Sequence, residues 1–323
     1  MRTEQLTDIA ARYGIPEPTV TFIRHNENRT YRAEGSDGQT YLLRIHQPVE
    51  DGMAGLQHTY EGLLGELVML EELSKWDDLP SQRPLRNEAG DLITLIEIDG
   101  RTQNCSVITW LDGRDMTKDD VKDPVIAHKV GHDLARLHTF FRQHRQQGLE
   151  YRPSQGIDYN EHMVQVIRSG HDRGLFTSGD VATVARTVDF IIKQLKERGT
   201  SEWGLIHGDV NLGNTIISPA GEICFIDYGF YGPGYYLSDI AMGAMMVPSD
   251  NRERFLQGYY GQNRGYDEDI NILEGFMLLS IIGYYVFMME NEAIHDWMRE
   301  RMPRLCENYC IPYLKGARIF DQI

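Results

Sequence analysis

The sequence predicts an α+β fold in two lobes: a small N-terminal lobe built on an antiparallel sheet with one helix, and a larger, mainly helical C-terminal lobe. The chain has 323 residues, and a single hydrophobic core stops growing at roughly 250–300 residues. Strand patterns dominate up to residue 107, and helical patterns dominate after residue 113. No repeat or low-complexity linker intervenes, so we place the lobes at residues 1–107 and 114–323, with a tight crossover at 108–113.

The first lobe opens with strand patterns. Residues 20–34 and 39–46 read as strands joined at Gly35–Gly38, where an Asp-Gly pair is typical of a hairpin turn. Two further strand candidates are residues 92–98 and 105–111. Together they predict a small antiparallel sheet.

Helical spacing marks the rest of the chain. Within residues 59–76, leucines recur at intervals of four, three and three, which predicts one helix crossing the sheet. Beyond the crossover, Asp123-Pro124 supplies an N-cap and a first-turn proline for an amphipathic helix. Its apolar stripe consists of Ile126, Val130, Leu134, Leu137 and Phe141. More helices are expected to about residue 199 and again after a strand and loop region at 205–237.

Composition excludes several classes of protein. Hydrophobic residues make up 41% and charged residues 25%, the ordinary globular mixture. The net charge of −16 repels nucleic-acid phosphates and anionic lipids, so we expect neither partner. The N-terminus lacks the pattern of a secretory signal. The longest apolar stretch, residues 275–289, is too short to span a bilayer and predicts a buried helix.

The cysteines indicate a reducing compartment. Cys105, Cys224, Cys306 and Cys310 are too few and scattered for a disulfide framework or a four-thiolate zinc site, so we expect reduced thiols in cytoplasm. Cys306 and Cys310 stand four residues apart and can share a helix face, but two ordinary buried cysteines are favoured over a metal or redox pair.

The strongest chemical signal is the segment His207-Gly208-Asp209-Val210-Asn211-Leu212-Gly213-Asn214, followed by a hairpin that ends at Asp227-Tyr228-Gly229. An acid, an amide five residues on and a second acid after a hairpin are what phosphoryl transfer from ATP requires. Asp209 would orient and deprotonate an acceptor hydroxyl. Asn214 and Asp227 would hold Mg²⁺, a hard cation that prefers oxygen ligands. An acidic surface loop with this pattern by accident is the disfavoured alternative.

This combination of spacing, order and flanking apolar strands resembles the aminoglycoside phosphotransferase and choline kinase superfamily. The resemblance implies a two-lobed, protein-kinase-like fold, an ATP and Mg²⁺ requirement, and a structural role for His207 in holding the loop. Residues 236–241 look like the family's helix start, in which Asp239 braces the catalytic loop. An N-cap role would explain Asp239 equally well.

The resemblance extends to the predicted sheet. Glu27-Asn28-Arg29-Thr30-Tyr31 lies where these families place the loop that covers the ATP phosphates, so Asn28, Arg29 and Thr30 are candidate nucleotide contacts. The segment has no glycine, unlike the Gly-rich kinase loop, so its phosphate contacts would come from the N–H groups of a tight turn or from side chains. An ordinary polar hairpin turn remains the alternative.

Arg44 stands where the family's strand carries a phosphate-gripping lysine. Arginine keeps its charge and offers a bidentate fork, so phosphate binding is chemically reasonable. Glu66, on the following helix, is the candidate partner that fixes Arg44. Because Glu61, Glu71 and Glu72 lie nearby, a merely solvated glutamate is the alternative.

The crossover at residues 108–113 resembles the hinge whose backbone pairs with adenine. Thr109, Trp110 and Leu111 are therefore candidate cofactor contacts through their backbone groups. For the Trp110 side chain, we expect core packing rather than stacking on the base.

The acceptor is the open question. Ten positions separate Gly229 from Asp239, and this span has no Ala-Pro-Glu or activation segment, which favours a small-molecule acceptor over a peptide. The resemblance implies an acceptor site made by C-lobe helices, here residues 159–168 and 258–297. Those stretches carry Tyr259, Tyr260, Tyr284, Tyr285, Trp297, Asp267, Glu268, Glu290 and Glu292.

An acidic, aromatic cleft favours a cationic acceptor such as an aminoglycoside, choline or an amino alcohol. Aromatic residues at helical spacing also serve as core, and a type II homoserine kinase or a protein kinase of the same fold is the alternative enzyme. A nucleotide-binding pseudokinase is the non-enzymatic alternative; Asp209, Asn214 and Asp227 together argue against it. A monomer or homodimer is expected.

Overall fold

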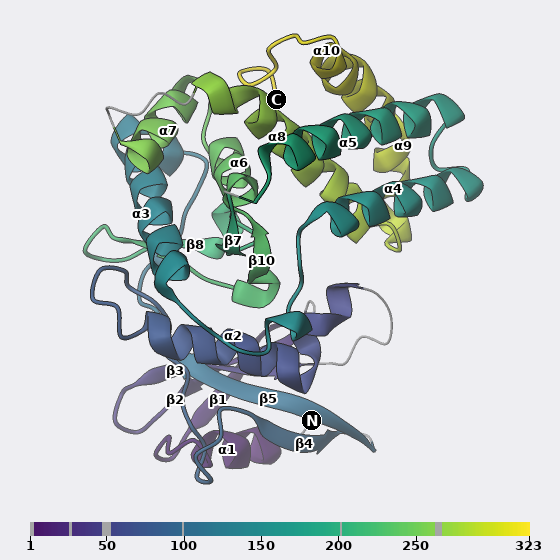
Figure 1. The fold of residues 1–323 in the computed structure, drawn as a ribbon. Coiled ribbons are helices and arrows are strands. Elements are labelled where there is room, and N and C mark those ends of the chain that lie inside the picture. Colours follow the sequence, from purple (N-terminus) through teal and green to yellow (C-terminus); the bar gives the residue numbers. More distant parts are fainter. Residues whose placement is uncertain (1–2, 26–27, 47–52, 99, 201, 262–266) are drawn as a thin grey trace. The chain divides into compact units, whose positions relative to one another are not determined.

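The computed structural model describes residues 3–25, 28–46, 53–98, 100–200, 202–261 and 267–323 (Figure 1). The chain forms two compact units. The first consists of Met1–Arg114, His144–Pro153 and Ile216–Phe230, and the second contains the remainder. The stretch Met1–Arg114 ends beside the crossover predicted at residues 108–113. The segments His144–Pro153 and Ile216–Phe230, which we had assigned to the C-terminal lobe, belong to the first unit.

The first unit is built on a five-stranded antiparallel sheet of order β1-β2-β3-β5-β4. The strands are β1 (Thr19–His25), β2 (Asn28–Glu34), β3 (Thr40–His46), β4 (Thr94–Ile98) and β5 (Arg101–Thr109). The region 20–34, predicted as one strand, holds the antiparallel pair β1 and β2, whereas β3, β4 and β5 coincide with predicted strands, with shifted ends. The prediction of an antiparallel sheet is confirmed.

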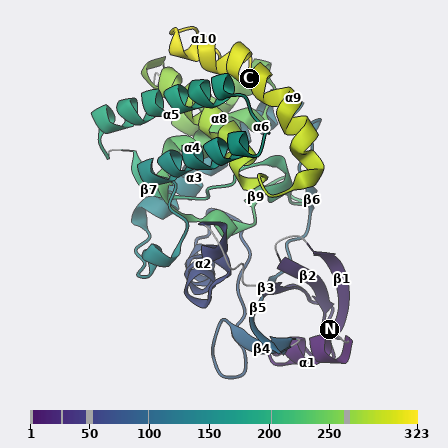
Figure 2. The same cartoon turned by 90° about the vertical axis from the view of Figure 1, so that its right-hand side faces the viewer.

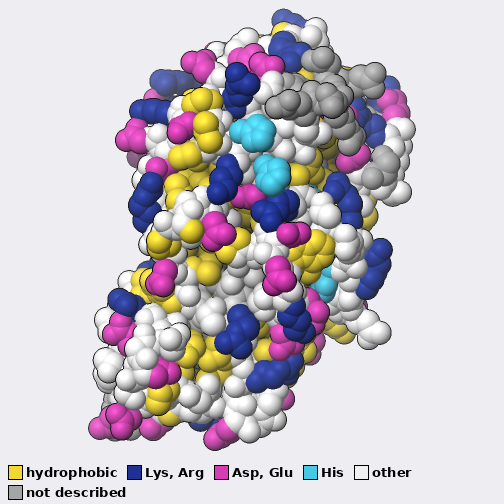
Figure 3. All heavy atoms as spheres, turned by 90° about the vertical axis from the view of Figure 1, so that its left-hand side faces the viewer, with side chains coloured by type: hydrophobic (Ala, Val, Ile, Leu, Met, Phe, Trp, Pro, Cys, Tyr) yellow, Lys and Arg dark blue, Asp and Glu magenta, His cyan; other side chains and the backbone are white. Residues whose placement is uncertain are grey.

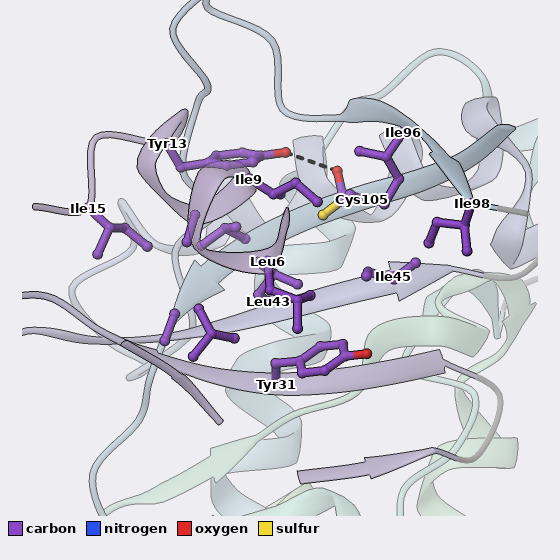
Figure 4. Close-up of a cluster of buried hydrophobic side chains, with 14 residues drawn as sticks. Leu6, Ile9, Tyr13, Ile15, Tyr31, Leu43, Ile45, Ile96, Ile98 and Cys105 are labelled. Atoms are coloured by element: carbon purple, nitrogen blue, oxygen red, sulfur yellow. Dashed lines mark hydrogen bonds between the residues drawn. The ribbon is translucent and has the colours of Figure 1, made fainter. Parts of the chain in front are cut away.

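Two helices, α1 (Thr3–Ala11) and α2 (Tyr60–Leu73), lie on opposite faces of this sheet (Figure 1). On the α1 face, Leu6, Ile9 and Tyr13 pack against inward side chains of the strands, and the Tyr13 hydroxyl donates to the Cys105 carbonyl oxygen at 2.9 Å (Figure 4). Because side chains alternate along a strand, the neighbouring residues of β3 face α2 instead. Within the residues that the structure describes, the unit therefore has the α-helix α1 in addition to the predicted helix that crosses the sheet.

The α2 face of the sheet is apolar at one end and polar at the other. Leu63 and Leu67 of α2 pack with Ile108 of β5. Further along the same face, Arg44 of β3 pairs in register with Ser106 of β5. The Thr59 hydroxyl caps α2 by accepting from the Gly62 N–H at 3.0 Å, which fixes where the helix begins.

The second unit is mainly helical, as predicted. Its helices are α3 (Pro124–Gln143), α4 (Ile157–Asp172), α5 (Ser178–Arg198), α6 (Tyr236–Met246), α7 (Arg252–Tyr260), α8 (Asp267–Phe287), α9 (His295–Leu305) and α10 (Ile311–Leu314). The helices α4, α5 and α8 pack on one another, and α6 also packs on α8 (Figure 2).

The apolar helix α8 forms much of the core of the second unit. Among the described residues, the stretch Asp269–Phe287 has the length and apolarity of a membrane crossing, but most of it is buried inside the protein. This stretch contains most of residues 275–289, which were predicted to form a buried helix.

On the face of the molecule drawn in Figure 3, Lys and Arg side chains are interspersed with Asp and Glu side chains.

Short strands frame the loops that carry the chemistry. In the second unit, β7 (Trp203–Ile206) pairs antiparallel with β10 (Gly232–Tyr235), and β7 leads directly into His207. The strands β8 (Thr215–Ile217) and β9 (Ile223–Phe225) lie in a three-stranded sheet with β6 (Arg114–Asp115). These elements form the predicted strand and loop region.

Candidate active site

Two side-chain amides hold the Asp209 carboxylate. The Asn211 Nδ2 donates to Oδ1 at 2.9 Å, and the Asn214 Nδ2 donates to Oδ2 at 2.7 Å and to the Asp209 carbonyl oxygen at 3.0 Å. Amide donors on both oxygens fix the orientation of the carboxylate. The structure thus brings the predicted base and the predicted amide ligand together within the second unit.

Asn211 is a residue that the sequence analysis left without a role. Its Oδ1 accepts from the Asn214 N–H at 3.2 Å, which caps the short turn Leu212–Asn214, while its Nδ2 contacts Asp209. An asparagine directly before a tight turn is the available signal, because this side chain favours caps.

Asp239 braces the backbone ahead of Asp209. Its carboxylate is buried and accepts from the His207 N–H at 2.7 Å and from the Gly208 N–H at 2.9 Å. The residue that caps α6 is Tyr235, so the alternative N-cap explanation for Asp239 is wrong. The buried His207 accepts from the Asp209 N–H through Nδ1 at 3.3 Å, a contact within the loop itself.

His138 of α3 completes this brace, although sequence reasoning gave it no role. Its Nε2 lies 2.9 Å from Asp239 Oδ2 and its Nδ1 lies 2.7 Å from the Tyr259 hydroxyl. Burial lowers the pKa of His138, with the bond to Asp239 acting in the opposite direction, and burial raises the pKa of Tyr259. A protonated phenol therefore donates to Nδ1, which leaves Nε2–H to donate to Asp239.

In the first unit, Arg44 and Glu66 form a buried ion pair. Arg44 Nη1 lies 2.7 Å from Glu66 Oε1, and both side chains are less than a tenth exposed. Among the described residues, Nε and Nη2 of Arg44 have no hydrogen-bond partner, so two guanidinium donors remain available to a ligand. The alternative glutamates Glu71 and Glu72 pair with Arg86 and Lys75 instead.

The segment predicted to cover the phosphates is largely strand. Asn28, Arg29 and Thr30 are strand residues of β2, paired in register with His46, Ile45 and Arg44. Glu27 lies outside the described residues. The interpretation of Asn28–Thr30 as a turn was therefore wrong, because the ladder with β3 continues through them.

The predicted adenine-binding stretch is partly occupied by the sheet's own hydrogen bonds. The Thr109 N–H donates to the Arg83 carbonyl oxygen at 2.8 Å, and the Trp110 N–H donates to that of Thr40 at 3.1 Å. The Trp110 side chain is 37% exposed, with the Arg32 guanidinium 5.5 Å from its ring centroid. The expected core packing of Trp110 is thus wrong, because cation–π contact replaces it.

Asp227 belongs to the first unit and has an unusual backbone. Its φ of +63° lies in the left-handed region, which non-glycine residues adopt at a cost. Its side chain is half-exposed, with Arg24 Nη2 of β1 at 3.8 Å from Oδ2. Arg24 is a further residue that sequence reasoning missed, since nothing in its strand pattern distinguishes it from a solvated arginine.

Comparison with known proteins decides the family. The model of the phosphotransferase enzyme family matches residues 19–270, which include the Asp209 loop and Asp227. The chain belongs to this family. That assignment confirms the superfamily inferred from the residues around Asp209.

The relatives of this chain are distant. An uncharacterized protein of Deinococcus radiodurans is 24% identical over 246 residues, which cover 72% of this chain and 64% of that protein. The match therefore spans less than two thirds of the relative's length.

Solved structures show the same fold. An amicoumacin kinase in complex with AMP-PNP, Ca²⁺ and Ami has a TM-score of 0.74 at 19% identity, over 95% of this chain and 94% of that one. A microcompartment-associated aminopropanol kinase has a TM-score of 0.75 at 18% identity, over 98% of both chains. The chain thus has the predicted kinase-like fold.

Some of the residues predicted to line an acceptor site make contacts inside the protein. Tyr259 contacts His138, and Tyr285 is buried and stacks on Trp297 at 5.4 Å between ring centroids. Glu290 forms an exposed ion pair with Arg173. The bond to His138 therefore accounts for Tyr259 and core packing for Tyr285, whereas Tyr284 is 49% exposed. The side chains of Asp267 and Glu268 lie outside the described residues.

Oxygen donors suited to Mg²⁺ are present in both units. The Asn214 amide uses its Nδ2 for Asp209, which leaves its Oδ1 facing away from those bonds as an acceptor. Asp227 offers a half-exposed carboxylate. Amide and carboxylate oxygens are the ligands that this hard cation prefers, so each of the two side chains, taken in its own unit, fits the metal.

Proposed function

We propose that the chain transfers the γ-phosphoryl group of Mg²⁺·ATP to a hydroxyl of a small, amine-bearing molecule. The observation that carries this proposal is the Asp209 carboxylate, which Asn211 and Asn214 hold by both oxygens on a loop braced by the buried Asp239. A positioned carboxylate of this kind is what a hydroxyl nucleophile needs, whereas a nucleotide-binding module has no use for it.

In the proposed reaction, the acceptor hydroxyl donates its hydrogen bond to Asp209. As the hydroxyl oxygen forms a bond to the γ-phosphorus, the bond from that phosphorus to the β,γ-bridging oxygen breaks, ADP leaves, and the hydroxyl proton passes to Asp209 and then to solvent. The amides of Asn211 and Asn214 keep the carboxylate aimed throughout. Positioning of this kind contributes much of the rate in phosphoryl transfer.

Residues of the first unit would hold the nucleotide. Arg44, fixed by Glu66 through Nη1, would donate to phosphate oxygens through Nε and Nη2. Because the N–H groups of Thr109 and Trp110 already donate within the protein, we assign adenine recognition to the Trp110 carbonyl oxygen and the Leu111 N–H. Asn214 and Asp227 would hold Mg²⁺, which, when bound, neutralises charge on the transferring phosphates.

An amino alcohol is the acceptor class that we favour. The chain carries a net charge of −16, which attracts cationic molecules. One structural neighbour is named an aminopropanol kinase. The four cysteines are free and buried, which supports a reducing compartment, and we propose the cytoplasm.

An ADP-release assay with ATP and Mg²⁺ tests the proposal. The acceptor panel contains 1-amino-2-propanol, ethanolamine, choline, homoserine and several aminoglycosides. We expect acceptor-dependent ADP release that is lost in Asp209→Asn and retained in the matched control Asp119→Asn, whose carboxylate pairs on the surface with Lys122. Mg²⁺-dependent nucleotide binding without turnover on any acceptor would support the pseudokinase alternative instead.

A further inference from the structure

Arg152 is a buried arginine whose guanidinium contacts two separate backbone segments of the first unit. It follows the short helical turn Leu149–Tyr151 and is 2% exposed. Its Nη1 donates to the Gly62 carbonyl oxygen at 2.8 Å. Its Nη2 donates to the carbonyl oxygens of Tyr228 and Gly229, both at 2.7 Å.

Both segments carry residues of the proposed site. Gly62 lies in the first turn of α2, one helical turn before Glu66, which holds Arg44. Tyr228 and Gly229 directly follow Asp227, the proposed metal ligand. One guanidinium therefore joins the helix that aims the phosphate-binding arginine to the turn that presents the metal-binding carboxylate.

Gly65 of α2 leaves room for the Arg152 side chain. A Cβ atom placed on Gly65 would lie 3.0 Å from Arg152 Cδ and 3.3 Å from Gln146 Nε2. The same Gln146 Nε2 donates to the Gly65 carbonyl oxygen at 2.8 Å. The glycine thus allows the segment His144–Pro153, which belongs to the first unit, to approach α2 closely.

The chemistry of these bonds makes them sensitive to backbone position. The acceptors are carbonyl oxygens of the main chain, and charge-assisted hydrogen bonds are stronger than neutral ones. Asp227 occupies a backbone conformation that costs free energy, so surrounding contacts must hold it there. Arg152 donates hydrogen bonds to the carbonyl oxygens of Tyr228 and Gly229, the two residues that follow Asp227.

We propose that Arg152 is a positioning residue that fixes the backbone around Asp227 against α2 and so sets the affinity of the site for Mg²⁺. This proposal rests on the proposed function, because it assigns the metal to Asp227. The competing explanation is that Arg152 only stabilises the fold. The two differ in whether loss of Arg152 changes metal affinity or thermal stability alone.

The chain offers a matched control in Arg252. This arginine is also buried, and it also donates to backbone carbonyls: its Nε donates to that of Ala244 at 3.0 Å, and its Nη1 and Nη2 donate to those of Phe320 and Ile323. It lies in the second unit and touches none of the proposed site residues. Arg252→Met therefore removes a buried guanidinium of the same kind.

The experiment compares Arg152→Met with Arg252→Met by calorimetric titration of AMP-PNP across a series of Mg²⁺ concentrations, with melting temperatures measured in parallel. Residues that orient a metal ligand without touching the metal typically contribute about 10–100-fold to metal affinity. We expect Arg152→Met to raise the Mg²⁺ concentration for half-maximal AMP-PNP binding at least about 10-fold. Arg252→Met should lower the melting temperature and leave the Mg²⁺ requirement unchanged.

A second variant covers the case in which Arg152→Met does not fold. Arg152→Lys retains the charge but has one donor nitrogen, so it cannot reproduce the guanidinium fork, and a shift in the same direction is expected. An unchanged Mg²⁺ requirement in either folded variant, or an equal shift in Arg252→Met, overturns the proposal. If the wild-type chain itself shows no Mg²⁺-dependent AMP-PNP binding, the proposed function fails and this inference fails with it.

Discussion

The two acidic residues of the proposed site are held in place by different means. Asp209 is oriented by the side chains of Asn211 and Asn214, all within one short loop. Asp227 has a left-handed backbone, a half-exposed side chain, and following residues that Arg152 contacts from 76 positions away in the sequence. Neighbouring side chains thus aim the carboxylate of the base, with Asp239 bracing the backbone of its loop, whereas the backbone that follows the proposed metal ligand is held by a side chain distant along the chain.

The largest effect should come from Asp227→Ala. Loss of a residue that orients a metal ligand lowers metal affinity by about 10–100-fold, and removal of the ligand itself should lower it further. We therefore expect Mg²⁺-dependent AMP-PNP binding to weaken by at least about 100-fold. Calorimetry measures this directly, and unchanged affinity would show that Asp227 does not bind the metal.

Asp209→Asn should separate the roles of the two acids. The variant should fold and bind Mg²⁺·ATP as the wild type does, while kcat falls by roughly 10²-fold or more, because only the general base is lost. An ADP-release assay measures the loss of turnover, and calorimetry measures the unchanged affinity for Mg²⁺·ATP. Near-native kcat would remove Asp209 from the mechanism.

Variants of Arg44 and Glu66 test whether a contact between residues 22 positions apart also positions the proposed phosphate-binding arginine. Arg44→Ala removes a charge-assisted contact worth on the order of 1.5–3 kcal/mol, a roughly ten- to hundred-fold drop in kcat/KM for ATP. Glu66→Gln should cost less, because the arginine stays charged but is badly aimed. The double variant should be less impaired than the product of the single effects. Strict additivity, with all variants folded, would mean that the pair does not act as a unit.

The smallest effect is expected at Arg24. Its ion pair with Asp227 is half-exposed and 3.8 Å long, and such pairs are worth about 0.2–1 kcal/mol. A cation beside the ligand opposes Mg²⁺, so Arg24→Ala should lower the Mg²⁺ requirement by no more than about five-fold, and added salt should abolish the difference. A raised requirement would indicate instead that Arg24 contacts nucleotide phosphate.

Local patterns predicted much of this molecule. The strands, the leucine-spaced helix α2 and the Asp209 loop are each specified by neighbours within a few residues, so alternation, helical spacing and a motif identified them. Asn28–Thr30 was misplaced because a polar strand end and a polar turn have the same composition. Trp110 was misjudged because Arg32, which contacts it, lies on a different strand.

What the sequence did not reveal depends on long-range packing. The His138–Asp239 contact spans 101 positions and the Arg152–Gly62 contact spans 90. In one sequence, His138 reads as part of an amphipathic helix and Arg152 as a loop residue. Neither has a local pattern that distinguishes it from an ordinary side chain.

The close approach at Gly65 bears on protein engineering. A glycine inside a helix costs about 1 kcal/mol relative to alanine, so Gly65→Ala would ordinarily be chosen to raise thermal stability. Here the added methyl group would meet Arg152 Cδ. Shortening residue 152 to make room would leave the carbonyl oxygens of Gly62, Tyr228 and Gly229 without their donor, so selection for heat tolerance alone should also keep glycine at 65. Selection for catalysis should retain both original residues.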